Sequence, residues 1–260
     1  MAYWIDSHAH LIFDEFKDNF DVYMQRAKEA NVGRIMCVCL NVEQLEYGFK
    51  IKEQYPYVDL AIGYFPLDVK KLSEEDWFKL EEAIKDERVL AVGEIGLDYF
   101  WDTSYNELQK ACFIRQIELA NKYNKPIITH VRDAHDDALE LLLNHPPKMG
   151  GIMHCYSGSL ENAKKLEPLG FCFAFGGPLT YPDLEEGRDI IENMPLSCIL
   201  VETDCPSLPP YEHLNENSES SYVHYAGELV AQLTNLDIET VQRQMQNNYE
   251  RLFGKLNIEE

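Results

Sequence analysis

The sequence has few basic residues for its length. It carries 23 lysines and arginines against 45 aspartates and glutamates, which gives a formal net charge of −22 over 260 residues. Such an excess of negative charge repels polyanions at long range and argues against a broad nucleic-acid-binding surface. It leaves room for a local anion site, because bound cations can offset the carboxylates there.

Long apolar runs and a disulfide framework are also missing. No run approaches the roughly 18 apolar residues that a bilayer-spanning helix needs. The N-terminus does not have the basic-then-apolar layout of a signal peptide, so we expect a cytoplasmic protein with no membrane partner. No obligate protein partner is evident from the sequence, and we expect none. The seven cysteines are odd in number and lie mostly in apolar runs. Cys155 and Cys205 adjoin candidate ligands, but adjacent strand side chains point in opposite directions, which favours small apolar packing over thiolate ligation.

The chain shows no convincing linker, repeat or low-complexity segment, and no GxGxxG follows its first apolar run, which argues against the commonest Rossmann interpretation. Short apolar runs instead alternate with longer amphipathic ones, the pattern of strands buried on both faces between helices. The eight predicted strands cover residues 3–6, 34–40, 58–62, 89–93, 126–129, 151–153, 171–175 and 198–201. Eight such units in this length predict an α/β fold, a single-domain (β/α)₈ TIM barrel over residues 1–260, with an open doubly wound sheet as the alternative.

The segments between the strands have helical spacing. Phe113, Ile117 and Ala120 recur at i, i+4 and i+7 and form one apolar stripe. Ser159 is a suitable N-cap for a helix through Leu169, and a helix over 238–253 should end at Gly254. Residues 206–221 are rich in proline, serine, asparagine and glutamate, and we interpret them as a long loop at the active-site face.

Six candidate metal ligands lie at the ends of the predicted strands. The carboxyl ends of barrel strands meet at one face, so these side chains should converge. Taken singly, each has an ordinary structural explanation, such as a core histidine or a turn aspartate. Their shared placement favours a catalytic metal centre. The six are His8 and His10 in IDSHAH, Glu94 in VGEIGLDY, His130 in IITHVRD, His154 in GIMHCYSG and Asp204 in LVETDCP.

The two carboxylates of this set are the candidate catalytic residues. A buried Glu94 needs a nearby cation, and its two oxygens suit a bridge between two metals. Asp204 can bind metal, accept a proton from the attacking water, or do both. Glu202, two residues earlier, is placed to orient a ligand histidine. The other histidines, His135, His145, His213 and His224, fall in predicted helices or loops and receive no role.

Candidate substrate contacts follow the same strands. Arg132 has the planar fork that binds phosphate or carboxylate, although a salt bridge to Asp133 or Asp136 explains it equally well. Tyr156 is the second candidate contact. Together with Tyr99, Phe100 and Trp101 it could stack on bases, and packing over the barrel rim is an equally common role for such aromatics.

Six motifs together resemble the TatD family of metal-dependent deoxyribonucleases, within the amidohydrolase superfamily. They are DSHAH at 6–10, VGEIGLDY at 92–99, ITHVRDA at 128–134, MHCYSGS at 153–159, ETDCP at 202–206 and NNYERLFG at 247–254. The resemblance implies two divalent metal ions, with Zn²⁺, Mg²⁺ and Mn²⁺ as candidates. One would be held by His8, His10, Glu94 and Asp204, and the other by Glu94, His130 and His154.

Two departures from the family pattern concern the substrate. Phe65, in GYFP, stands where the family usually has a histidine. Between residues 206 and 250 the only arginine or lysine is Arg243, whereas relatives often carry basic residues after the ETD motif. These departures bear on the DNA substrate more than on hydrolysis.

The sequence therefore predicts a metal-dependent hydrolase. The first hypothesis is a 3′–5′ exonuclease that cleaves phosphodiesters of single-stranded DNA. The second is an amide, ester or lactone hydrolase, including an aminoacyl-tRNA deacylase, on the same metal centre. The third is a metal-binding partner protein without catalysis.

Overall fold

The computed structural model describes residues 2–255, in which eight parallel strands follow one another in sequence order around one sheet. The last strand returns to the first: Ala9 forms a parallel bridge with Cys205, and the N–H groups of Asp204 and His10 donate to the carbonyl oxygens of His8 and Cys205 at 3.0 and 2.9 Å. The sheet is thus a nearly closed barrel, as the sequence predicted. The strands are β1 (Trp4–Ala9), β2 (Val32–Cys39), β3 (Val58–Ile62), β4 (Val89–Asp98), β5 (Ile127–Arg132), β6 (Gly151–Met153), β7 (Phe171–Phe175) and β8 (Ile199–Val201).

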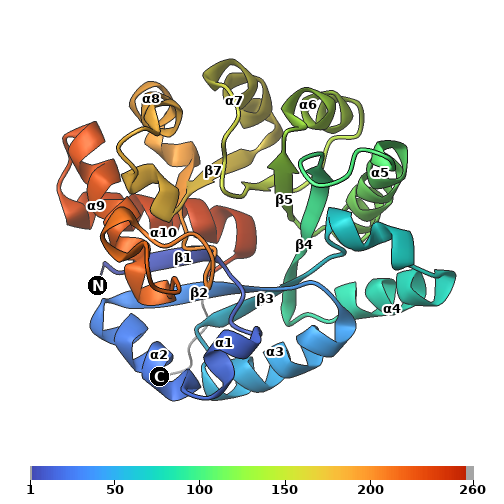
Figure 1. The fold of residues 1–260 in the computed structure, drawn as a ribbon, viewed down its shortest axis with the longest axis horizontal. Helices are drawn as coiled ribbons and strands as arrows, with labels where there is room; N and C mark the ends of the chain where they lie inside the picture. The colour runs from blue at the N-terminus through green and yellow to red at the C-terminus, as the bar shows by residue number, and fades with distance from the viewer. Residues whose placement is uncertain (1, 256–260) are drawn as a thin grey trace.

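Helices lie around the outside of the strands (Figure 1). They are α1 (Asp14–Lys17), α2 (Phe20–Glu29), α3 (Val42–Gln54), α4 (Glu74–Ile84), α5 (Asn106–Tyr123), α6 (His135–Asn144), α7 (Leu160–Leu166), α8 (Glu185–Asn193), α9 (Val223–Thr234) and α10 (Ile238–Phe253). Short 3₁₀ turns are η1 (Pro66–Lys71), η2 (Glu167–Leu169), η3 (Gly177–Thr180), η4 (Leu196–Cys198), η5 (Tyr211–His213) and η6 (Ser220–Tyr222). Within residues 2–255, no helix is both long and apolar enough to cross a membrane.

Several local predictions about the helices are confirmed. Phe113, Ile117 and Ala120 of α5 are fully buried against the barrel. The Ser159 side chain caps α7 by accepting the N–H of Asn162. Helix α10 ends at Phe253, directly before Gly254. The apolar period of α5 therefore identified the face that packs on the strands.

Three strands run further than predicted. β1, β4 and β5 continue through His8, Glu94 and His130, whereas the predicted strands stop before these residues. The prediction ended each strand near its first polar side chain. The hydrogen-bonded pairing of the strands continues past that point, because these polar side chains are buried or half-buried. Gly93 and Gly96 lie within the extended β4. These glycines allow β5 to approach closely, since a Cβ at Gly96 would lie 2.0 Å from the carbonyl oxygen of His130.

A buried ion pair near the N-terminal ends of β2 and β3 is hydrogen-bonded to α10. Arg34 in β2 donates to Asp59 in β3 at 2.6 Å, and the Tyr249 hydroxyl donates to the same carboxylate at 2.9 Å. All three side chains are buried. Because the charges are paired and hydrogen-bonded, they tolerate burial, and they hold the last helix against the strands.

Candidate metal centre

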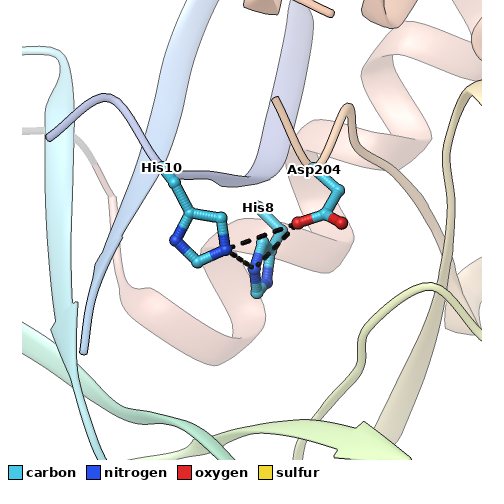
Figure 2. Close-up of side chains that lie close together, drawn as sticks. All are labelled: His8, His10 and Asp204. Atoms are coloured by element: carbon cyan, nitrogen blue, oxygen red, sulfur yellow. Dashed lines mark hydrogen bonds and ion pairs between the residues drawn. The ribbon is translucent and has the colours of Figure 1, made fainter. Parts of the chain in front are cut away.

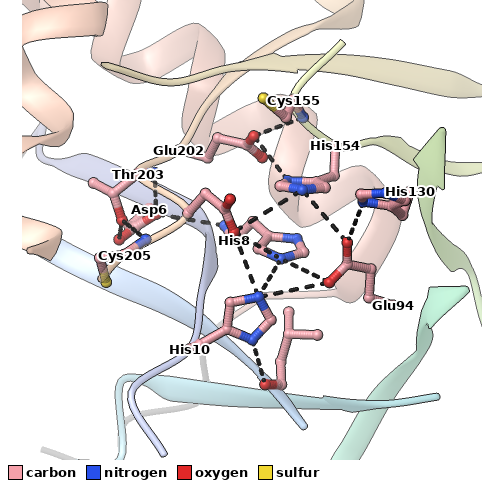
Figure 3. Close-up of polar contacts among 12 residues, drawn as sticks. Asp6, His8, His10, Glu94, His130, His154, Cys155, Glu202, Thr203 and Cys205 are labelled. Carbon is pink, nitrogen blue, oxygen red and sulfur yellow. Dashed lines mark hydrogen bonds and ion pairs between the residues drawn. The ribbon is translucent and has the colours of Figure 1, made fainter. Parts of the chain in front are cut away.

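The six predicted ligands converge at one end of the barrel. His8, Glu94 and His130 lie within β1, β4 and β5, while His10 and His154 directly follow β1 and β6 and Asp204 lies just beyond β8. Figure 3 shows these side chains, apart from the unlabelled Asp204, pointing toward a common point between the strand ends. Segments far apart in the sequence therefore supply one site.

His8, His10 and Asp204 form the first group of donors (Figure 2). Nε2 of His8 and Nε2 of His10 lie 3.3 Å apart. Each also lies near Oδ1 of Asp204, at 3.6 Å for His8 and 3.4 Å for His10. Two imidazole nitrogens and a carboxylate oxygen facing one point are a donor set for a divalent transition metal.

Glu94 joins this group to a second one formed with His130 and His154. Its Oε2 lies 3.6 and 3.5 Å from Nε2 of His8 and of His10. Its Oε1 lies 2.8 Å from Nδ1 of His130 and 3.5 Å from Nε2 of His154. One carboxylate thus presents one oxygen to each group, which is the placement that a bridging ligand requires.

The far nitrogen of three of the imidazoles is held by another group. Nδ1 of His10 donates to the Val38 carbonyl oxygen at 3.1 Å. Nδ1 of His154 lies 2.9 Å from Oε1 of Glu202, and Nε2 of His130 lies 3.0 Å from Oδ2 of Asp98. In each case the other nitrogen faces the centre. Such partners fix the ring orientation of a metal-binding histidine and raise its basicity. The predicted position of Glu202 beside a ligand histidine agrees with this geometry.

Asp98 is a contributor that the sequence interpretation did not assign. It lies at the end of β4, four residues after Glu94, and is buried. Burial raises the pKa of its carboxyl, but the His130 hydrogen bond and charge bring that pKa below its ordinary value. The sequence signal for Asp98 was its place in the same motif as Glu94. Its contact with His130 follows only from the pairing of β4 with β5.

We expect Asp98→Asn to weaken metal binding. The amide removes the negative charge that holds His130, and loss of such a partner typically lowers metal affinity or activity by about 10- to 100-fold. Isothermal titration of the metal-free protein with Zn²⁺ or Mn²⁺ measures the effect. Asp102→Asn, at an exposed carboxylate paired with Lys70, is the matched control. Equal affinity in all three proteins would contradict the role given to Asp98.

Asp6 is a second unassigned residue, and it joins the two segments that carry His8 and Asp204. Its carboxylate accepts the Thr203 N–H at 2.9 Å and the Thr203 hydroxyl at 2.7 Å. Complete burial raises the pKa of Asp6 to about 7. The first and last strands are therefore linked at the level of the donors.

The carboxylates of the centre favour the ionised form. Burial alone would raise the pKa of Glu94, but His130, His154 and His8 hold it well below its ordinary value. Burial acts on Asp204 in the same way, and the same kind of imidazole contacts lower its pKa. Among residues 2–255, neither carboxylate forms an ion pair with lysine or arginine. Buried anions whose partners are imidazoles match the chemistry of a cation site.

Three of the four histidines of the metal-free centre have a raised pKa. Burial lowers the pKa of His154, yet the carboxylates of Glu202, Asp204 and Glu94 together raise it to about 10. The pKa values of His10 and His130 are raised by carboxylates against the same effect of burial. The pKa of His8 is lowered by burial and by the neighbouring His154. The metal-free centre therefore keeps protons where a bound cation would lie.

Metal affinity should consequently rise with pH. A metal binds the neutral imidazole, so binding must displace the proton of His154, and this proton competes less as the pH rises through neutrality toward 10. Calorimetric titrations in buffers of different protonation enthalpy should report proton release. His154→Gln should release fewer protons than the wild type, whereas His145→Gln, outside the centre, should match it. Affinity that is independent of pH would refute the protonated metal-free state.

Arg132 lies at the rim of the centre, with an exposed side chain. The alternative salt bridge to Asp133 or Asp136 is absent from the ion pairs of the described chain. The guanidinium instead lies over the Phe100 ring, 3.7 Å from its centroid. Its positive charge contributes to the lowered pKa of Asp98, after the larger effects of burial and His130, which places it in electrostatic reach of the centre.

Tyr156 has the packing role that the sequence analysis gave as the alternative to a substrate contact. Its side chain is buried, and its hydroxyl donates to the Ser159 carbonyl oxygen at 2.9 Å. The ring packs against Phe173, with centroids 4.8 Å apart. This position explains the residue by packing and offers no free hydroxyl, so a substrate contact stays a prediction without geometric support.

The two departures from the family pattern lie at Phe65 and in the segment that begins at residue 206. The Phe65 ring packs edge-on against His130, with centroids 4.7 Å apart, and so covers a candidate ligand with an apolar surface. Residues 218–221 are buried, and Glu219 forms a bidentate ion pair with Arg26 of α2. The end of the predicted loop is thus fixed to the barrel wall.

Comparison with known proteins places this geometry in a family. The model of the family described as TatD related DNase matches residues 5–254. The chain belongs to the TatD family of metal-dependent hydrolases. The resemblance inferred from the six motifs is therefore confirmed over nearly the whole chain.

The similar proteins extend this result. The chain is 36% identical over 249 residues to the "Uncharacterized metal-dependent hydrolase YabD" of Bacillus subtilis, covering 95% of this chain and 98% of that protein. The crystal structure of YjjV, a TatD homolog from Escherichia coli, superposes with a TM-score of 0.92 at 31% identity, covering 97% of this chain and 98% of that one. A TatD family hydrolase from Entamoeba histolytica, at 21% identity and a TM-score of 0.83, shares the fold.

Proposed function

We propose that this TatD family member is a 3′–5′ exonuclease that hydrolyses phosphodiester bonds in single-stranded DNA. The observation that carries the proposal is the position of Glu94, whose two oxygens face two separate groups of donors at the barrel mouth. Centres of this kind, with paired metals, serve phosphodiester displacement.

The donor set fits two divalent cations. His8, His10, Glu94 and Asp204 would hold one, and Glu94, His130 and His154 the other. Imidazole and carboxylate donors suit Zn²⁺ or Mn²⁺, and Mg²⁺ is also a candidate because the carboxylates of Glu94 and Asp204 are among the donors. When bound, such ions lower the pKa of a water and neutralise charge on the phosphoryl oxygens.

Other steps fall to side chains of this protein: proton acceptance, orientation of the ligand histidines and binding of the phosphate. Asp204, ionised and partly exposed, is placed to accept a proton from the attacking water. Glu202 and Asp98 keep His154 and His130 in the required orientation. Arg132, at the rim and free of a carboxylate partner among the described residues, binds a phosphate oxygen of the substrate.

Support for DNA comes from the family description, and support for a single strand comes from the charge. A net charge of −22 disfavours an enzyme that binds along a long duplex. A single-strand end needs to approach only the bound metal ions and Arg132 at the mouth of the barrel. The seven cysteines are all free thiols, which fits a cytoplasmic setting.

An ester, amide or lactone hydrolase on the same centre is the second candidate. A pocket of about 100 Å³ adjoins Cys155 and is lined mainly by apolar side chains, among them Phe175, Leu179 and Leu184. This pocket, lined by the residue that follows His154, would accept an apolar acyl group.

Metal-stripped protein reconstituted with Mg²⁺, Mn²⁺ or Zn²⁺ tests the proposal on single-stranded DNA labelled at either end. Stepwise release of nucleotides from the 3′ end by the wild type, and not by His130→Ala, is expected. His145→Ala controls for preparation and contaminating nuclease. Release from neither end by fully metallated protein would reject the nuclease. Turnover of small esters or lactones would then establish the second candidate, and no turnover at all would favour a metal-binding partner protein.

A further inference from the structure

Two large aromatic side chains stand exposed at the rim of the metal centre. Trp101 is 67% exposed and Phe100 is 50% exposed, in the loop that follows β4. Their rings meet edge to face, with centroids 4.8 Å apart. Adjacent exposed aromatics at the mouth of an active site mark a surface that binds a ligand more often than one that only faces water.

Arg132 completes this group, which we name the rim cluster (Phe100, Trp101 and Arg132). Its guanidinium lies 3.7 Å from the centroid of Phe100 and 5.7 Å from that of Trp101. Nearby cations are neutralised, since Lys70 pairs with Asp102 and Lys110 with Asp137. Arg132 has no carboxylate partner among residues 2–255, so in this acidic chain it keeps its charge available for an anion.

The rim cluster is physically connected to the donors. The Phe100 N–H donates to Oδ1 of Asp98 at 3.0 Å, and Oδ2 of the same carboxylate lies 3.0 Å from His130. Arg132 follows His130 by two residues at the end of β5. A ligand on the cluster therefore lies beside the position where a bond would be hydrolysed.

We propose that the rim cluster is a stacking subsite for an unpaired nucleobase, with Arg132 contacting the adjoining phosphate. An aromatic face and a guanidinium together match the two parts of a nucleotide, and stacking accepts any base because each has a π-face. Bases within a duplex are covered by their neighbours, so the subsite selects single strands. This inference rests on the proposed function and names how the substrate strand is recognised.

Binding can be measured apart from hydrolysis. Mn²⁺-loaded protein is titrated with a phosphorothioate-linked deoxyoligonucleotide, which resists cleavage, and with the same strand carrying one abasic residue at its 3′ end. Fluorescence anisotropy of the labelled strand gives the affinity. The intrinsic fluorescence gives a second signal, since Trp4 and Trp77 are buried and Trp101 is the exposed tryptophan of the three.

Trp101→Ala should weaken binding of the intact strand by about tenfold, the usual effect of removing one stacked aromatic. Trp101→Phe should retain most of the affinity, and the strand should quench the fluorescence of the wild type much more than that of Trp101→Phe. The abasic strand should bind the wild type and Trp101→Ala equally. Phe78→Ala, which removes a 63% exposed aromatic from α4, is the matched control and should change nothing.

The outcomes separate this inference from the proposed function. Equal binding of the intact strand by the wild type and Trp101→Ala would overturn the subsite, whether or not the wild type cleaves DNA. A tenfold loss in Trp101→Ala without nucleotide release from cleavable DNA would support the subsite and reject the exonuclease. No binding of any strand by metallated wild type would overturn both. Unchanged DNA binding with a lower oligomeric state in Trp101→Ala would assign the cluster to protein contact instead.

Discussion

Replacing Glu94 with glutamine is expected to lower kcat/KM for the proposed phosphodiester hydrolysis by about 10³ and to remove bound metal. Glutamine keeps the shape of the side chain but loses the charge that faces both groups of donors. Charge stabilisation by metal ions supplies several kcal/mol, and about 4 kcal/mol corresponds to about 10³ in rate. Elemental analysis and steady-state kinetics on the same preparation measure both effects.

Glu46→Gln is the control for this change, because Glu46 is an exposed carboxylate on α3. It should keep the metal content and rate of the wild type. If Glu94→Gln also kept both, Glu94 would not join the two groups of donors.

The second large effect is expected for Asp204→Asn, whose kcat should fall by about 10²–10⁴, the usual contribution of a general base. Asp204 has a left-handed backbone conformation with φ of 53°, which asparagine tolerates better than most residues. The amide oxygen can still face a metal, but the amide cannot accept the proton. Metal content should therefore fall much less than the rate.

The pH profile distinguishes the proton-accepting role of Asp204 from ligation. Burial raises the pKa of Asp204, but His154, His10 and His8 hold it below its ordinary value, so the base stays ionised until the pH falls below the usual range of an aspartate. At saturating metal, that acidic limb should be present in the wild type and absent from the residual activity of Asp204→Asn. A parallel loss of metal and rate, with the limb retained, would make Asp204 a ligand alone.

The sequence was sufficient for the barrel and for the convergence of the donors, because both follow from local patterns. Each donor lies at or near the end of a short apolar run, and parallel strands of one barrel end at a common face. His8, Glu94 and Asp204 could thus be placed together without any knowledge of register.

Contacts between strands were beyond that pattern. Asp98 reaches His130 only through the register in which Gly96 pairs with His130, and Asp6 reaches Thr203 only because the barrel closes. The direction of a side chain at or after the end of a strand could not be predicted either. The Tyr156 hydroxyl contacts the Ser159 carbonyl, and the Arg132 guanidinium lies over the Phe100 ring. Each depends on the backbone path of a loop, which residue types alone do not specify.

The closure of the barrel between β1 and the segment after β8 also governs when the protein can acquire its metal during synthesis. His8 and His10 leave the ribosome well before Asp204, whose N–H donates to the carbonyl oxygen of His8 in the folded barrel. A nascent chain therefore presents the two imidazoles before the carboxylate that completes their site has been made. That group of donors is complete only when the barrel has closed, and a chain that ends before Asp204 lacks its carboxylate.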